Sequence, residues 1–112
     1  MRLLDLSTET EGTTVRLALT GELDIAGAAR VEQELERIEQ EPPATLVLDL
    51  RELAFMDSTG LRVIVAADDR AREQERRLVV VRGSDTVQRI IAMTRLDERL
   101  EIVDDLTAVE PA

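Results

Sequence analysis

Alternating apolar and polar positions open the chain and predict a β-hairpin. Residues 3–7 have the pattern of a short strand, and the Glu11-Gly12 pair has the composition of a turn. Residues 13–20 then place three apolar side chains on one face, as a half-buried strand does. Gly21 is expected to end this second strand.

Two longer segments repeat apolar residues every three or four positions, which predicts amphipathic helices. The first covers residues 26–40, follows Asp24 as a candidate N-cap, and stops before Pro42-Pro43. The second covers residues 59–75. Its apolar residues extend around the helix, so more than one side of it is expected to be buried.

Compact apolar runs at residues 46–50 and 78–81 predict buried strands, and residues 51–57 are expected to form a loop. Ser84 is placed to cap a third helix. The end of the chain predicts an edge strand at residues 100–103 and a last short helix.

This order of elements predicts an α/β fold in one domain over residues 1–112. The expected architecture is a mixed β-sheet with an N-terminal hairpin followed by β-α crossovers, in the order β-β-α-β-α-β-α-β-α. Parallel strands bring the loops at residues 21–25, 51–57 and 82–84 to the same carboxyl edge of the sheet. Function is expected at that edge.

Composition excludes several classes of chemistry. The chain has one Phe, no Trp and no Tyr, so its core is expected to be aliphatic. It has no Cys and no His, which excludes disulfides, zinc or copper sites built from thiolate or imidazole, and catalysis by a His base or a Cys nucleophile. No metal and no other cofactor is expected.

The net charge of −10 argues against nucleic acid or an anionic membrane as a partner, because both are polyanions. No apolar run approaches the length of a membrane span, and the N-terminus lacks the pattern of a signal peptide. A cytoplasmic location is therefore expected.

The segment around Ser58 is the strongest candidate for function, and it allows two interpretations. Ser58 can be an ordinary N-cap, with Asp57 neutralising the positive end of the helix dipole. It can also be an exposed hydroxyl beside an apolar docking patch of Phe55, Met56 and Leu61. A phosphate on that hydroxyl would be held by the free helix amides and would block docking by its charge and bulk.

Two motifs carry a resemblance to a known family: GELDIAGA at residues 21–28 and LDLRELAFMDSTGLRVIV at residues 48–65. With them the chain resembles the STAS domain family, and within it the free-standing anti-sigma factor antagonists. The resemblance implies that the unphosphorylated protein binds an anti-sigma factor that is also an ATP-dependent serine kinase, and so frees a sigma factor. It further implies that this kinase phosphorylates Ser58 and that a PP2C-type phosphatase reverses the modification.

The resemblance also implies a partner-binding surface in and beside the two motifs. Its expected residues are Glu22, Asp24, Ile25, Phe55, Met56, Asp57, Thr59, Gly60, Leu61 and Arg62. No enzymatic activity is expected. A Ser58 nucleophile would need a neighbouring base, the chain has no His, and Asp57 does not supply the orienting partner that a triad requires. The alternative function is a non-switching STAS scaffold, or a partner subunit of a stress-signalling or lipid-transport complex. Weak nucleotide binding also stays open, although the chain has no phosphate-binding loop motif.

Overall fold

The N-terminal hairpin forms as the sequence predicts, but both of its strands are longer. In the computed structural model, which describes residues 3–109, β1 covers Asp5–Glu11 and pairs antiparallel with β2, which covers Thr14–Leu23. Every second residue of β2 is buried and the intervening residues are half-buried, so one face of this strand meets the core. The buried side chains are Val15, Leu17, Leu19 and Leu23.

Gly21 does not end β2, and the prediction that it would was wrong. Its φ of +98° is a conformation that side chains disfavour, and a Cβ there would lie 2.2 Å from the carbonyl oxygen of Leu3. The register between β2 and β3 shifts on either side of it. Gly21 therefore lies in a bulged region through which β2 continues to Leu23.

The third strand is also longer than predicted. β3 covers Thr45–Met56, so the expected loop over residues 51–57 is strand as far as Met56. The extension pairs with the extended end of β2, where Leu23 lies beside Met56. From Leu50 onward the buried residues of β3 are Leu50, Leu53 and Met56. They are spaced by three because the ladder is irregular there, so the period of two is lost.

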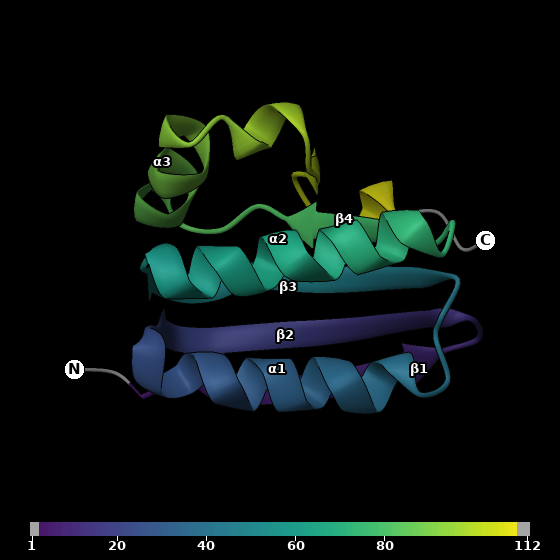
Figure 1. Ribbon diagram of the computed structural model, residues 1–112. Helices are drawn as coiled ribbons and strands as arrows, with labels where there is room; N and C mark the ends of the chain where they lie inside the picture. Colours follow the sequence, from purple (N-terminus) through teal and green to yellow (C-terminus); the bar gives the residue numbers. More distant parts are fainter. Residues whose placement is uncertain (1–2, 110–112) are drawn as a thin grey trace.

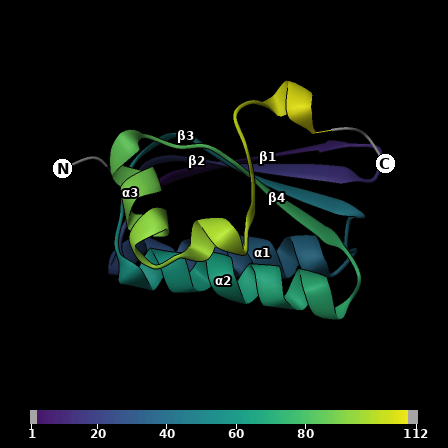
Figure 2. The same ribbon diagram turned by 90° about the horizontal axis from the view of Figure 1, so that it is seen from above.

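The strands lie in the sheet in the order in which they occur along the chain, from β1 to β5. The pairs from β2 onward are parallel. Strands added in one direction through right-handed crossovers place the connecting helices on the same face, and Figure 2 shows α1 and α2 below the sheet. The remaining strands are β4 (Arg77–Val81) and β5 (Glu101–Val103), and the helices are α1 (Ile25–Glu39), α2 (Ser58–Glu73) and α3 (Asp85–Met93) (Figure 1).

The core between the sheet and the helices is aliphatic, as the composition predicts. Asp24 caps α1 through the amides of Ala26 and Gly27, and Ser84 caps α3 through the amide of Val87; both caps were predicted. Two short 3-10 helices follow, η1 (Leu96–Glu98) and η2 (Leu106–Ala108), so the expected last helix is a single turn. Within residues 3–109, no helix is long and apolar enough to cross a bilayer.

The opposite face of the sheet has a different covering. The chain after β5 crosses to this face, where η2 lies (Figure 2). Asp49 of β3 is buried there and accepts hydrogen bonds from Arg16 at 2.8 Å and from Arg51 at 2.7 Å. Burial alone would raise the pKa of Asp49, but the hydrogen bonds from the two arginines outweigh it and hold this pKa below its ordinary value.

This network predicts how stability responds to acid. The ionised Asp49 stabilises the fold above an unfolded-state pKa of about 4, and this contribution is lost as the pH falls through the lower folded-state pKa. Asp49→Asn should lower the free energy of unfolding at pH 7 by about 2 kcal/mol. It should also make stability fall less steeply between pH 5 and pH 3 than in the parent chain.

Urea denaturation at several pH values measures both effects. Glu9→Gln is the matched control, because Glu9 also pairs with Arg16 but its side chain is 65% exposed. A pair so exposed should change stability by less than about 0.5 kcal/mol. Equal losses in the two variants would contradict a stabilising role for the buried carboxylate.

Candidate functional site

Three loops meet at the carboxyl edge of the sheet, as the topology predicts. The amide of Asp57 donates to the carbonyl of Leu23 at 3.1 Å, which joins the end of β3 to the end of β2. The hydroxyl of Ser84 donates to the carbonyl of Ala54 at 3.3 Å, which joins the loop after β4 to β3. All three helices begin at this edge, on the left of Figure 1.

Asp57, and not Ser58, caps α2. The Asp57 carboxylate accepts the amide of Gly60 at 3.0 Å, and its carbonyl accepts the amide of Leu61 at 3.0 Å. Ser58 is the first residue of the helix, so the interpretation of Ser58 as the N-cap was wrong by one position. Both residue types are good caps, and the sequence pattern alone cannot choose between neighbours.

The Ser58 side chain is exposed, and within residues 3–109 its hydroxyl makes no hydrogen bond. The amides of Ser58 and Thr59 likewise have no acceptor among the described residues. A helix leaves its first amides free unless a cap or a ligand takes them. Ser58 therefore offers an unused hydroxyl beside two unused donors.

Close packing sets the position of this helix end. Gly60 is buried, and a Cβ there would lie 2.6 Å from the Leu23 side chain and 3.1 Å from the Met56 side chain. Its φ is not in the left-handed region, so the glycine is needed for the close approach and not for a turn. The first turn of α2 thus rests directly on the ends of β2 and β3.

The expected apolar patch is only partly exposed. Met56 is fully buried, so the prediction of an exposed Phe55-Met56 pair was wrong for Met56. Its neighbour Leu23 points with it into the core, because residues paired in a parallel ladder share a face. Phe55 is 39% exposed and lies beside Glu22 on the opposite face of the sheet. Leu61 is buried in the core as well, so the prediction of an exposed apolar patch was also wrong for Leu61.

The structure therefore divides the ten residues expected to bind a partner. Three of them, Met56, Gly60 and Leu61, are buried. The others are Asp24, Ile25 and Asp57 at the edge, Thr59 and Arg62 along α2, and Glu22 and Phe55 toward the opposite face. Ile25 is 75% exposed and gives the edge a large exposed apolar side chain.

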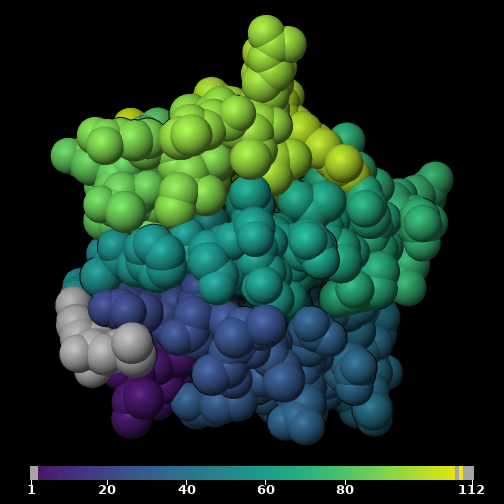
Figure 3. Space-filling model, turned by 60° about the vertical axis from the view of Figure 1, so that its left-hand side comes forward, coloured from purple at the N-terminus to yellow at the C-terminus, as the bar shows by residue number. Residues whose placement is uncertain are grey.

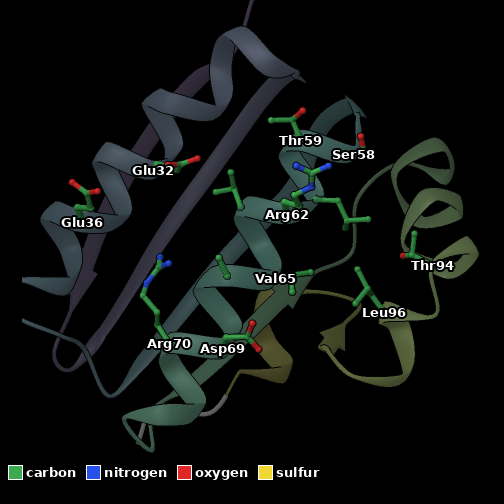
Figure 4. A pocket seen from close by; sticks show the side chains of 13 residues that line it. Glu32, Glu36, Ser58, Thr59, Arg62, Val65, Asp69, Arg70, Thr94 and Leu96 are labelled. Atoms are coloured by element: carbon green, nitrogen blue, oxygen red, sulfur yellow. The ribbon is translucent and has the colours of Figure 1, made fainter.

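An open groove of about 760 Å³ runs along α2 between α1 and η1, and Ser58 and Thr59 lie at one end of it (Figure 4). Figure 3 shows the same helices as adjacent bands across one side of the molecule. The groove was not predicted from the sequence. Two apolar residues of α2 outside the core line it: Val65, which is half-buried, and Ala66, which is exposed. The lining residues not anticipated are Glu32, Glu36, Val63, Val65, Ala66, Asp69, Arg70, Thr94 and Leu96.

The polar wall of the groove is mixed in charge. Glu32 and Glu36 come from α1, and Asp69, Arg62 and Arg70 come from α2. Arg70 forms an ion pair across the two helices, with Nε 2.6 Å from Glu39 Oε1, and this hydrogen bond raises the pKa of Arg70. Within residues 3–109, no group of three or more acidic side chains could hold a metal ion.

Comparison with known proteins identifies the family. Residues 5–108 match the family model described as the STAS domain. The chain belongs to the STAS domain family. This STAS domain is 34% identical over 88 residues to a Listeria monocytogenes protein named anti-sigma-B factor antagonist. The aligned residues cover 79% of this chain and 77% of that protein. It is 31% identical over 90 residues to the Mycobacterium tuberculosis anti-sigma-F factor antagonist RsfB, and this alignment covers 80% of this chain and 73% of RsfB.

Solved structures share the fold. A crystal structure of an anti-sigma factor antagonist from Mycobacterium paratuberculosis superimposes with a TM-score of 0.88 at 24% identity, covering 95% of this chain and 90% of that chain. The anti-sigma factor antagonist SpoIIAA in its unphosphorylated form gives a TM-score of 0.72 at 19% identity, covering 95% and 92%. The STAS fold predicted from the two motifs is therefore confirmed.

The helix end of this STAS domain allows a test of which residue supports the fold. Asp57→Ala removes the cap of α2 and should lower the free energy of unfolding by about 1 kcal/mol. Ser58→Ala removes a hydroxyl that bonds to nothing among the described residues and should change this free energy by less than about 0.5 kcal/mol. Chemical denaturation of both variants measures the difference. A larger loss for Ser58→Ala than for Asp57→Ala would contradict the assignment of the cap.

Proposed function

We propose that this STAS domain is an anti-sigma factor antagonist in the cytoplasm and that Ser58 is its phosphorylation switch. In the unphosphorylated form it binds an anti-sigma factor that is also a serine kinase, and the sigma factor is released. Phosphorylation of Ser58 by that kinase ends the binding. A PP2C-type phosphatase restores the unphosphorylated form.

The observation that carries the proposal is the free hydroxyl of Ser58. It is exposed, it lies on the carboxyl edge of the sheet, and Asp57 performs the capping that Ser58 would otherwise provide. The fold therefore does not need this hydroxyl. A kinase can modify it without disturbing the core, which is the property that a reversible switch requires.

The names of the relatives support the same function. The Listeria and Mycobacterium tuberculosis proteins are named as antagonists of anti-sigma factors. The structural neighbour SpoIIAA has been solved in an unphosphorylated and in a phosphorylated form. Both forms superimpose on this chain with the same TM-score of 0.72, which suits a switch that changes a surface and not a fold.

The physics of the switch follows from the charges around Ser58. A phosphate adds about −1.5 to −2 charges and three acceptor oxygens. Asp57 precedes it in the chain, and Asp24 follows Leu23, to which Asp57 is bonded. The modified edge would become strongly anionic and heavily hydrated. An apolar or acidic partner surface that fits the free serine would then lose its contact.

The docking surface in this proposal combines the edge and the groove. Ile25 gives the edge an exposed apolar residue, and Ser58 and Thr59 connect the edge to the groove along α2. Arg62 and the acidic residues of α1 supply charges of both signs. Phe55 and Glu22 extend the surface around the end of the sheet.

Phosphorylation is tested with the chain and a candidate anti-sigma kinase from the same genome, with ATP and Mg²⁺. Intact-mass and peptide mass spectrometry should find one phosphoryl group, on Ser58. Thr59→Ala should still be modified, whereas Ser58→Ala should not. A phosphoryl group on Ser58→Ala, or on no residue of the parent chain with any cognate kinase, would contradict the switch.

Binding is tested by calorimetry with the same kinase. Ser58→Ala should bind about as tightly as the parent chain, because it keeps a small neutral side chain at the edge. Phosphorylated protein should bind roughly tenfold more weakly or worse, and Ser58→Asp should follow it in direction. Ser7→Asp, which adds the same charge at an exposed position of β1, is the matched control and should bind normally. Equal affinities for Ser58→Asp and the parent chain would count against a block by charge.

A further inference from the structure

Arg62 is a cation without a partner. It is exposed on α2, one turn beyond Ser58, and within residues 3–109 it makes no hydrogen bond and no ion pair. The other arginines of this helix are both engaged: Arg70 pairs with Glu39 at 2.6 Å, and Arg72 pairs with Asp68 at 2.8 Å. Among the three arginines of α2, Arg62 is therefore the one whose charge is available to a new group.

Arg62 lies at an unfavourable position for an unpaired cation. Arg62 lies one turn from the N-terminal end of α2, where the helix dipole favours anions and disfavours cations. The N-cap carboxylate of Asp57 is bonded to the amide of Gly60, and the first turn of α2 itself contains no acidic residue. Glu32 also lines the groove, on the α1 side, but it forms no ion pair with Arg62. A second anion, on Ser58, would add to the favourable charge at the helix end and would give Arg62 a partner.

The geometry directs Arg62 toward Ser58. Residues four apart on a helix lie on the same face with their Cβ atoms about 5–6 Å apart, and the pair is strongest when the anion comes first in the chain. Side chains on a helix lean toward its N-terminus. Figure 4 shows the guanidinium of Arg62 directed toward that end of α2, on the side where Ser58 and Thr59 lie.

We infer that Arg62 is the internal counter-ion of phosphorylated Ser58. The inference rests on the proposed function, since it assumes that Ser58 carries a phosphate. The planar guanidinium can give two parallel hydrogen bonds to phosphate oxygens, and the free amides of Ser58 and Thr59 add donors at the helix end. The phosphate is then drawn along α2, over the end of the groove, and away from Asp57.

This pairing changes the docking surface in two ways at once. The free hydroxyl is replaced by a bulky group held across the groove, and the guanidinium that was free becomes engaged. Phosphorylation therefore withdraws both a neutral donor and a cation from a partner. No backbone movement is needed for either change.

The test uses the whole 112-residue chain with phosphoserine incorporated genetically at position 58, so that no kinase is involved. A ³¹P NMR titration measures the second pKa of the phosphate, which is about 6 in an isolated phosphoserine. Asp57, Asp24 and Glu32 are the carboxylates around the site and act to raise this pKa, whereas Arg62 lowers it. In Arg62→Gln the pKa should be higher than in the parent chain by roughly half a unit.

Two further variants keep the measurement specific. Arg62→Lys should restore part of the shift, because it keeps the charge and loses the planar fork. Arg89→Gln is the matched control: it removes an arginine that is exposed on α3 and also has no partner among the described residues, and it should leave the pKa unchanged. Equal pKa values in the parent chain and in Arg62→Gln would overturn the inference. So would an equal rise in Arg89→Gln, which would indicate only a general charge effect.

Failure of the proposed function gives a different result. If no cognate kinase modifies Ser58, the switch is disproved, while the titration of the incorporated phosphoserine still reports on Arg62. If the kinase modifies Ser58 and the titration finds no dependence on Arg62, the switch stands and only the counter-ion role is lost.

Discussion

The hydrogen bond from the amide of Asp57 to the carbonyl of Leu23 ties the ends of β2 and β3 together at the point where α1 and α2 begin. Gly60 packs against the side chains of Leu23 and Met56, at distances that leave no room for a Cβ. The first turn of α2 is therefore fixed against the sheet by backbone contacts and by core side chains. The surface that this edge presents to a partner depends on this attachment, because it decides which of residues 57–60 (Asp-Ser-Thr-Gly) face outward.

That attachment gives Asp57 and Ser58 different roles. Asp57 caps the helix through the amide of Gly60, so its carboxylate serves the fold. Ser58 is one residue further on, exposed and unbonded among the described residues, so its hydroxyl is available for chemistry. A phosphate placed there, as proposed, would act at the surface, and the aliphatic core beneath Gly60 would be left as it was. A switch of this kind can be reversed without unfolding, which a modification of a buried or capping residue could not.

Much of this arrangement could be predicted from the sequence. Hydrophobic periodicity predicts both ends of α1 and of α2 to within two residues, and it predicts a third helix after Ser84, because an amphipathic helix needs a continuous apolar stripe. The β-α order predicts the convergence of three loops at one edge, since parallel strands must end on the same side. The motifs around Asp24 and Ser58 predict the family, and Asp24 and Ser84 are the caps that their types and positions suggest. The aliphatic core follows from composition.

The sequence by itself thus determined the elements, their order and the segment that carries the chemistry, because these depend on local periodicity and on residue types. Tertiary structure decided the rest. The bulge at Gly21 let β2 and β3 run on to Leu23 and Met56, and this long-range pairing turned an expected loop into strand and buried Met56. It also moved the cap from Ser58 to Asp57, because the register of the helix is set by what its first turn packs against. The groove beside Arg62 needed two helices in contact, and no local pattern contains the distance between them.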